Sequence, residues 1–139
     1  MPRFEDVELG QQLPVEEETV EQGHLVRYAG ASGDFNPLHW DPEFATKVSP
    51  TGGIIAHGML NMGRVSRVVT EWAGGPTKVK RLVASFRVPC PVGATVRYGG
   101  EVTELDADAR TATLSVWAEL EDGSRLVDRR TSRAVVQLD

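Results

Sequence analysis

The chain has 139 residues, of which 40% are hydrophobic and 25% charged, as expected of a globular protein with a real core. Its net charge of -5 argues against nucleic acid as the main partner, because phosphate binding needs an excess of lysine and arginine. Cys90 is the only cysteine, so an intrachain disulfide is impossible and a reducing compartment is favoured. The sequence has neither a signal-peptide pattern nor an apolar run long enough to span a bilayer. We therefore expect a cytoplasmic protein, with no membrane partner, that forms a single domain over residues 1–139.

The first half of the chain is predicted to be helical after one early strand. The strand is expected over residues 12–19, and a short helix over about residues 21–30. A second short helix is predicted over residues 42–47, because Asp41 can cap its first turn and Pro42 suits its first position. Residues 48–56 are rich in glycine and proline and are expected to form a loop.

The main helix is predicted over residues 57–72, and Gly74-Gly75-Pro76 is expected to end it. At about 100° per residue, its polar side chains fall on one narrow face, and apolar side chains cover the rest. A helix so widely apolar is expected to be mostly buried. The predicted polar face consists of Asn61, Arg64, Arg67 and Glu71.

The second half alternates polar and apolar residues, as antiparallel strands do. Strands are predicted over residues 82–88, around Val96 and Tyr98, over 111–120, and over 126–137. Asp122-Gly123 is expected to form a hairpin turn before the last of them. One long buried helix followed by a run of strands predicts an α+β fold in which a sheet wraps round the helix.

The segment from Asp34 to His39 carries the strongest chemical signal. Asn36-Pro37 favours a turn, which can bring Asp34 and His39 to the same point in space. A carboxylate beside an imidazole is an acid/base pair, because the charge of histidine changes near neutral pH. Each residue on its own has a simpler interpretation, with Asp34 as a turn or cap residue and His39 as a surface histidine.

Residues 28–45 resemble the signature of hydratase 2, the (R)-specific enoyl-CoA hydratases of the MaoC-like group. The resemblance implies the hot-dog fold, in which an antiparallel sheet wraps one long helix. It extends over the whole chain, and residues 56–60 resemble the family's entry to the central helix. The signature residues here are Tyr28, Ser32, Gly33, Asp34, Asn36, Pro37, Leu38, His39 and Ala45.

The resemblance implies reversible syn addition of water to a trans-2-enoyl thioester, giving an (R)-3-hydroxyacyl thioester. The substrate would be an acyl-CoA or an acyl carrier protein thioester, and no metal or nucleotide cofactor is needed. Asp34 and His39 would share one water. Gly58 would stabilise the thioester oxyanion through a free N–H at the start of the central helix. His57 is expected to supply a backbone N–H there or to close the helix start, rather than to act as a second base.

Two supporting residues have alternative interpretations. Asn36 would tie the turn or help to hold the water, since an amide does not titrate in this range. Ser66 would either bond back to its own helix turn or steady the active-site loop and line the acyl pocket. A zinc site is not expected, because three scattered histidines and one cysteine lack ligand spacing. Six basic residues would meet CoA phosphates or an acidic carrier protein, or simply form a solvated face. They are Arg129, Arg130 and Arg133, with Lys78, Lys80 and Arg81.

The resemblance also implies assembly as a homodimer, or as a heterodimer with a second hot-dog subunit. One alternative is therefore the catalytic subunit of a heterodimeric 3-hydroxyacyl-ACP dehydratase of fatty acid elongation. Another is a hot-dog acyl-CoA thioesterase, although Glu71 lies at the far end of the helix from the expected site. A third is a non-catalytic acyl-binding subunit, which would have no need of the Asp34 and His39 pair.

Overall fold

The computed structural model describes residues 2–139, and Met1 lies outside the described residues. The helices are η1 (Phe4–Asp6), α1 (Gln22–Ser32), η2 (Pro37–His39), α2 (Pro42–Val48), α3 (Gly58–Ala73) and η3 (Pro76–Lys78). The strands are β1 (Glu16–Thr19), β2 (Val79–Val83), β3 (Thr95–Asp106), β4 (Thr111–Leu120), β5 (Arg125–Val127) and β6 (Arg133–Gln137).

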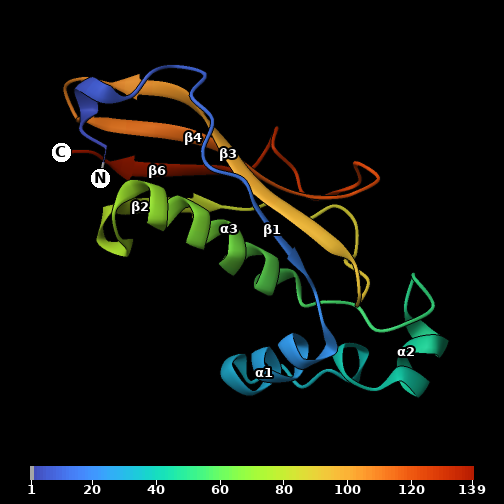
Figure 1. Cartoon of the computed structure of the whole chain (residues 1–139). Helices are drawn as coiled ribbons and strands as arrows, with labels where there is room; N and C mark the ends of the chain where they lie inside the picture. The colour runs from blue at the N-terminus through green and yellow to red at the C-terminus, as the bar shows by residue number, and fades with distance from the viewer. Residues whose placement is uncertain (1) are drawn as a thin grey trace.

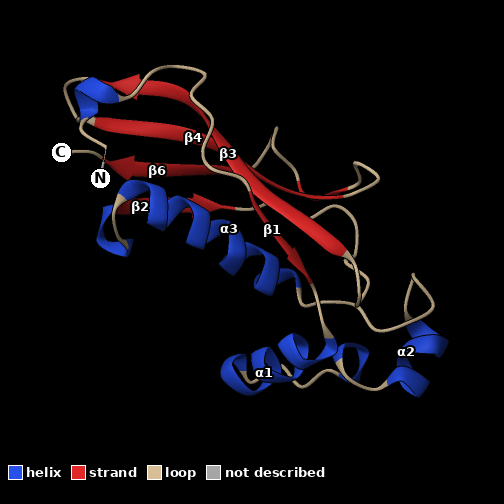
Figure 2. Cartoon of the chain, viewed as in Figure 1, coloured by secondary structure: helices blue, strands red, loops and turns tan. Residues whose placement is uncertain are grey.

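The strands form one 6-stranded antiparallel sheet in the order β1-β3-β4-β6-β2, with β5 paired to β4. The helix α3 lies along one face of this sheet (Figures 1 and 2). The core lies between the two, where Val65, Val68 and Val69 of α3 are buried together with the inward residues of β3, β4 and β6. The predicted α+β fold, with a sheet round a central helix, is confirmed.

The helix α3 ends as its sequence predicts. Gly74 has a left-handed φ of 89°, and its N–H bonds back to the carbonyls of Thr70 and Glu71. Glycine reaches this conformation without a steric penalty, which makes it the usual residue after a helix.

The predicted polar face of α3 is wrong at one position. Asn61 is only 3% exposed, whereas Met59 of the same helix is 55% exposed. The Asn61 amide oxygen accepts a hydrogen bond from the buried Tyr98 hydroxyl at 3.0 Å, so the acceptor end of the amide has a partner inside the protein. Arg64 is half-buried and pairs with Glu18 of β1 at 2.7 Å.

Two predicted strands differ in extent from the observed ones. β1 covers only residues 16–19, and Gln12 forms just an isolated bridge to Glu101. Pro14 lies between them and has no N–H to give to a ladder. β2 ends at Val83, and the following residues leave the sheet, although Phe86 makes an isolated bridge to Val127.

The strand predicted over residues 126–137 is split into β5 and β6 by a turn at Asp128. The Asp128 carbonyl accepts from the N–H groups of Thr131 and Ser132, and its carboxylate accepts from the Arg130 N–H at 3.0 Å. An aspartate that bonds the backbone ahead of it favours a turn over a continuous ladder.

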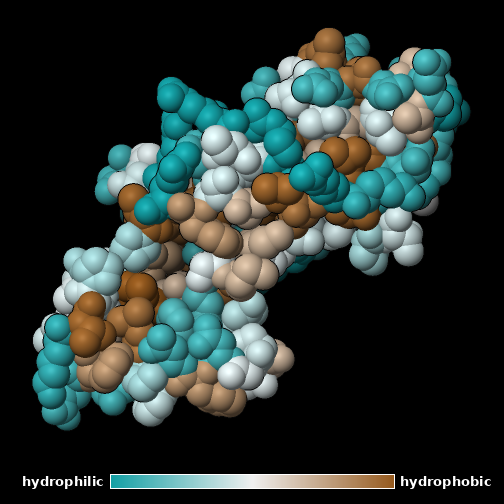
Figure 3. Space-filling view, turned by 180° about the vertical axis from the view of Figure 1, so that it is seen from behind, coloured by the Kyte–Doolittle hydropathy of each residue, from teal (hydrophilic) through white to brown (hydrophobic). Residues whose placement is uncertain are grey.

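The segment formed by α1, η2 and α2 lies beyond the N-terminal end of α3, away from the sheet (Figure 1). Large apolar side chains are exposed on it, and Figure 3 shows them as brown patches on the smaller end of the molecule. No helix within residues 2–139 is both long and apolar enough to cross a membrane. The exposed apolar residues of this segment are Val26, Phe35, Trp40, Phe44 and Val48.

Candidate active site

The turn between Asp34 and His39 is built by Asn36. The Asn36 side-chain oxygen accepts from the Leu38 N–H at 3.0 Å and caps η2, whose first residue is Pro37. The Asn36 backbone N–H donates to Asp34 Oδ1 at 3.2 Å. The predicted turn is therefore present, and Asn36 ties it together.

His39 and Asp34 face each other across this turn. His39 Nε2 lies 3.8 Å from Asp34 Oδ2, while His39 Nδ1 lies 2.7 Å from the Ile55 carbonyl oxygen. A carbonyl oxygen only accepts, so His39 Nδ1 donates to it, and this leaves Nε2 facing Asp34. The distance of 3.8 Å is too long for a direct hydrogen bond, but it suits groups that share a water.

His57 holds both members of this pair. Its ring stacks on the His39 ring with centroids 3.7 Å apart, and its Nε2 donates to the Asp34 carbonyl oxygen at 3.1 Å. The edge of Tyr28 packs against it at a centroid distance of 4.8 Å. Burial lowers the pKa of His57 below its ordinary value. The hydrogen bond to the Asp34 carbonyl acts in the opposite direction but is the smaller effect. His57 is therefore a neutral ring that positions the Asp34 loop.

A cavity of about 260 Å³ begins at His39 and runs beside the start of α3. Gly58 forms part of its wall, and a Cβ added there would lie 3.6 Å from the Phe86 ring. As the first residue of α3, Gly58 has an N–H for which the helix itself provides no carbonyl. Free N–H groups at a helix start favour a developing negative charge.

Of the predicted site residues, His39 and Gly58 line this cavity, while Asp34, Asn36 and His57 belong to the adjoining turn and loop. Ser66 lies half-buried about two turns further along α3, and it does not line the cavity among the described residues. Sequence reasoning also gave no site role to three residues of the cavity wall, Asn61, Arg87 and Cys90. Asn61 was assigned only to the polar face of the helix, and Cys90 is buried, with 2% of its surface exposed.

Several of the basic residues considered for CoA contacts have partners within the fold. Arg129 pairs with Glu119 at 2.9 Å and lies over the Trp117 ring at 5.0 Å. Lys78 pairs with Asp139, and Arg133 donates to two backbone carbonyls. These contacts favour a structural role for the three residues.

One group of side chains among the described residues has ligand atoms close enough together to hold a metal. It consists of Asp34, His39 and His57, whose ligand atoms all lie within 4.8 Å of one another. One nitrogen of each imidazole is engaged by a backbone carbonyl, and the rings are stacked. His57 Nδ1 is buried and has no hydrogen-bond partner among the described residues. The arrangement offers Asp34 Oδ2 and His39 Nε2 to a shared proton, and this chemistry needs no metal.

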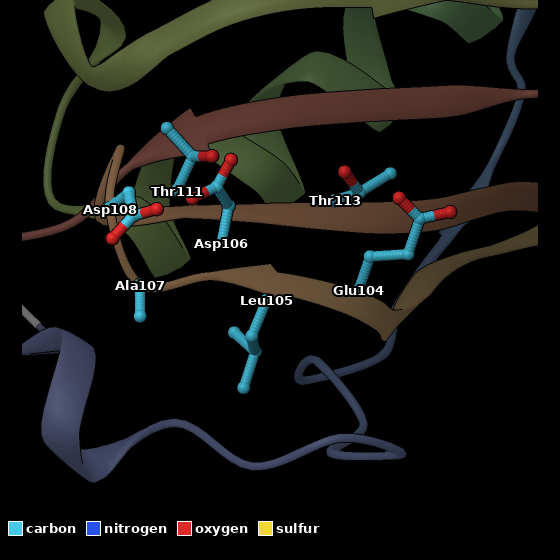
Figure 4. A pocket seen from close by; sticks show the side chains of 7 residues that line it. All are labelled: Glu104, Leu105, Asp106, Ala107, Asp108, Thr111 and Thr113. Atoms are coloured by element: carbon cyan, nitrogen blue, oxygen red, sulfur yellow. The ribbon is translucent and has the colours of Figure 1, made fainter.

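A second depression lies on the sheet at the turn between β3 and β4 (Figure 4). It is lined by acidic and small side chains, including Glu104, Asp106 and Asp108. None of the predicted site residues contributes to it.

Residues 6–121 match the family model of the MaoC like domain. The chain belongs to the MaoC-like domain family. It is 33% identical over 120 residues to the 3-hydroxybutyryl-CoA dehydratase of Methylorubrum extorquens, covering 86% of this chain and 75% of that protein. It is 35% identical over 115 residues to the (R)-specific enoyl-CoA hydratase of Aeromonas caviae, covering 82% and 83% of the two chains.

Solved structures of MaoC-like proteins share the fold. The (R)-hydratase from A. caviae involved in PHA biosynthesis superimposes with a TM-score of 0.86 at 32% identity, over 96% of this chain and 98% of that one. A MaoC-like dehydratase gives a TM-score of 0.91 at 35% identity over 99% of this chain, which spans only 42% of that longer protein. The ChsH1-ChsH2 complex from Mycobacterium tuberculosis gives 0.81 at 25% identity, over 95% and 98%. The predicted hot-dog fold and family are confirmed.

Proposed function

We propose that this MaoC-like protein catalyses the reversible hydration of trans-2-enoyl thioesters to (R)-3-hydroxyacyl thioesters. The observation that carries the proposal is the pairing of His39 Nε2 with Asp34 Oδ2 at 3.8 Å, beside a cavity that His39 and Gly58 line. The named relatives support it, since they include an (R)-specific enoyl-CoA hydratase and a 3-hydroxybutyryl-CoA dehydratase.

The proposed reaction uses three groups: Asp34 Oδ2, His39 Nε2 and the Gly58 N–H. A water held between Asp34 and His39 attacks C3 of the enoyl group and gives a proton to the pair. The pair returns a proton to C2, so it ends the cycle in the state in which it began. In the transition state, negative charge develops on the thioester oxygen, and the Gly58 N–H stabilises it. His57 positions the loop that carries Asp34, and Asn36 maintains the turn.

We further propose that the active form is a homodimer or a heterodimer with a second hot-dog subunit. The support is the similarity to the ChsH1-ChsH2 complex, together with 32% identity over 82 residues to the 3-oxo-4,17-pregnadiene-20-carboxyl-CoA hydratase beta subunit of M. tuberculosis. A heterodimeric 3-hydroxyacyl-ACP dehydratase is thus the second candidate. A thioesterase has less support, because Glu71 is exposed near the C-terminal end of α3 and does not line the cavity.

The activity is tested by following the loss of enoyl-thioester ultraviolet absorbance with trans-2-enoyl-CoA substrates of increasing length. Asp34→Asn and His39→Gln should each lower kcat by about 10²–10⁴-fold, the usual value of acid/base catalysis. Asp108→Asn and His24→Gln are matched controls outside the site and should leave the rate unchanged.

Two results would count against the proposal, and they differ in what they exclude. No turnover at any chain length, alone or with a partner subunit, would exclude the hydratase activity. A near-wild-type rate in Asp34→Asn or His39→Gln, with full activity in the parent protein, would exclude only the site assignment. Circular dichroism of each variant establishes that the fold is kept.

A further inference from the structure

Two polar side chains with hydrogen-bonding groups, Asn61 and Arg87, line the cavity beside His39 and have no part in the proposed water chemistry. Arg87 is exposed and donates through Nε to Asp128 at 3.0 Å, so its charge already has a partner and Asn61 is the buried one of the two. Asn61 lines this cavity and is 3% exposed. Its neighbours along the cavity wall are mostly apolar, among them Ile55, Val88 and Leu126. A polar group at such a place is costly unless it is hydrogen-bonded, so the partners of Asn61 determine its role.

Tyr98 of β3 fixes the orientation of the Asn61 amide. The Tyr98 hydroxyl donates to Asn61 Oδ1 at 3.0 Å, and this ring is 1% exposed. Burial raises the pKa of Tyr98, so its hydroxyl keeps its proton and remains a donor. The acceptor end of the amide is therefore occupied, and the NH₂ end is left with two donors.

Among the described residues, the one hydrogen bond found for the Asn61 side chain is the one that it accepts from Tyr98. Asn61 lies within hydrogen-bonding reach of the Cys90 thiol, whose pKa burial raises to about 11. A neutral thiol is a poor acceptor, so it satisfies an amide donor incompletely. Side chains on a helix also point toward its N-terminus, which directs Asn61 back toward the turn that begins at Gly58.

We propose that Asn61, oriented by Tyr98, selects substrates whose acyl group carries a hydrogen-bond-accepting oxygen beyond C3. The inference rests on the proposed function and names a substrate class for the same site. The cavity of about 260 Å³ lies at or below the lower end of ligand pockets, which span roughly 300–1,000 Å³, so the acyl group is short. A hydrocarbon chain in the cavity would bury the amide donors unpaired, which should lower its kcat/KM about ten- to hundredfold.

The test compares two substrates of the same length and shape. In 4-methoxy-trans-2-butenoyl-CoA an ether oxygen replaces the C5 methylene of trans-2-hexenoyl-CoA, and the pair 5-methoxy-trans-2-pentenoyl-CoA and trans-2-heptenoyl-CoA moves that oxygen by one position. The selectivity is the ratio of kcat/KM for the ether to that for the hydrocarbon. The quotient is the selectivity of the wild-type protein divided by that of Asn61→Leu. The two substrates differ in intrinsic reactivity, and this difference cancels in the quotient because it is the same for both proteins.

We expect this quotient to be about ten or more for at least one substrate pair. Because Asn61→Leu leaves the Tyr98 hydroxyl buried without a partner, the double variant Asn61→Leu/Tyr98→Phe serves as its stable counterpart, since replacing both partners by apolar groups is nearly neutral. Tyr98→Phe alone removes the contact that orients the amide. Its ratio of kcat/KM for the ether to that for the hydrocarbon should therefore lie between the ratios of the wild type and Asn61→Leu. A purely structural Asn61–Tyr98 pair would change the unfolding midpoint and leave the ratio at its wild-type value.

The inference fails separately from the proposed function. A quotient within threefold of one for both pairs, in a protein that hydrates enoyl-CoA, overturns it while the proposed function stands. If no enoyl-CoA is turned over, the binding of hexanoyl-CoA and 4-methoxybutanoyl-CoA is measured by calorimetry instead. The ratio of the two affinities in the wild-type protein is divided by the same ratio in the double variant. A quotient of about ten or more supports the inference, and one within threefold of one overturns it.

Discussion

Gly58→Ala separates the proposed oxyanion contact from the stability of the fold. The added Cβ would lie 3.6 Å from three carbons of the Phe86 ring, which is ordinary van der Waals contact and requires no rearrangement. Alanine is a better helix former than glycine by about 1 kcal/mol, so the free energy of unfolding should stay equal or rise by up to that amount. The methyl group nevertheless enters the wall of the cavity beside the Gly58 N–H.

The effect on catalysis should be large. An oxyanion must come within about 2.7–3.1 Å of its donor, and loss of one such donor costs roughly 10²–10³ in kcat, or about 2.7–4 kcal/mol. We therefore expect Gly58→Ala to lower kcat on crotonyl-CoA by at least about 100-fold while its urea midpoint is kept. The assay is the loss of enoyl absorbance, with urea unfolding followed by circular dichroism on the same samples.

Gly63→Ala is the matched control on the same helix. Gly63 is exposed, and a Cβ there would meet no atom within 4 Å. It should raise the free energy of unfolding by about 1 kcal/mol and leave kcat unchanged. The reasoning is refuted if Gly58→Ala retains kcat within threefold, or if both variants lose activity alike.

Three further predictions concern stability. Gly99→Ala should lower the free energy of unfolding by about 1–3 kcal/mol, because its Cβ would lie 2.4 Å from a Trp117 ring carbon; an unchanged urea midpoint would contradict this. Because burial lowers the pKa of His57, this ring takes up a proton at a higher pH in the unfolded chain than in the folded one. The free energy of unfolding should therefore fall as the pH drops below about 6.5, the ordinary pKa of histidine. Urea midpoints at pH 7.5 and 5.5 should differ less in His57→Phe than in the wild type, and an equal difference would exclude this cause. Asn36→Ala removes the cap on the Leu38 N–H and should cost about 1 kcal/mol in thermal unfolding, whereas an unaltered Tm would show that the turn does not need the cap.

The local part of the site could be predicted from the sequence. Asn36 and Pro37 restrict the backbone over only a few residues, so the turn that brings Asp34 toward His39 follows from neighbouring residues alone. The start of α3 at Gly58 is likewise a local feature. Such features do not depend on which distant segment packs against them.

The contacts that depend on the tertiary fold were not predictable. The His57 ring reaches the Asp34 carbonyl and stacks on His39 only after the loop before α3 has folded back on the turn. Asn61 was taken for a surface residue because helix periodicity records polarity and carries no information about partners. Its partner, Tyr98, comes from a strand far along the chain.

The sheet illustrates the same limit. The alternation of residues 126–137 predicted one strand, yet the run Asp128-Arg129-Arg130-Thr131-Ser132 forms a turn that splits it. The polar side chains in this run fit either structure. What decides between them is the set of backbone N–H groups that Asp128 can bond, and that set exists only in the folded chain.

Asp34 and His39 lie on the segment of α1, η2 and α2, whereas Asn61 lies on α3 and Tyr98 on β3 of the sheet. Figure 1 shows this segment beyond the N-terminal end of α3. The two sets share no hydrogen bond among those found, so a substitution at Asn61 or Tyr98 should leave the turn that holds Asp34 and His39 intact. Acyl preference can therefore drift during evolution while the water chemistry is retained. Two chains with the same Asp34-to-His39 turn can thus prefer different acyl groups. The residues at positions 61 and 98 should therefore distinguish the acyl preference of paralogues better than the turn does.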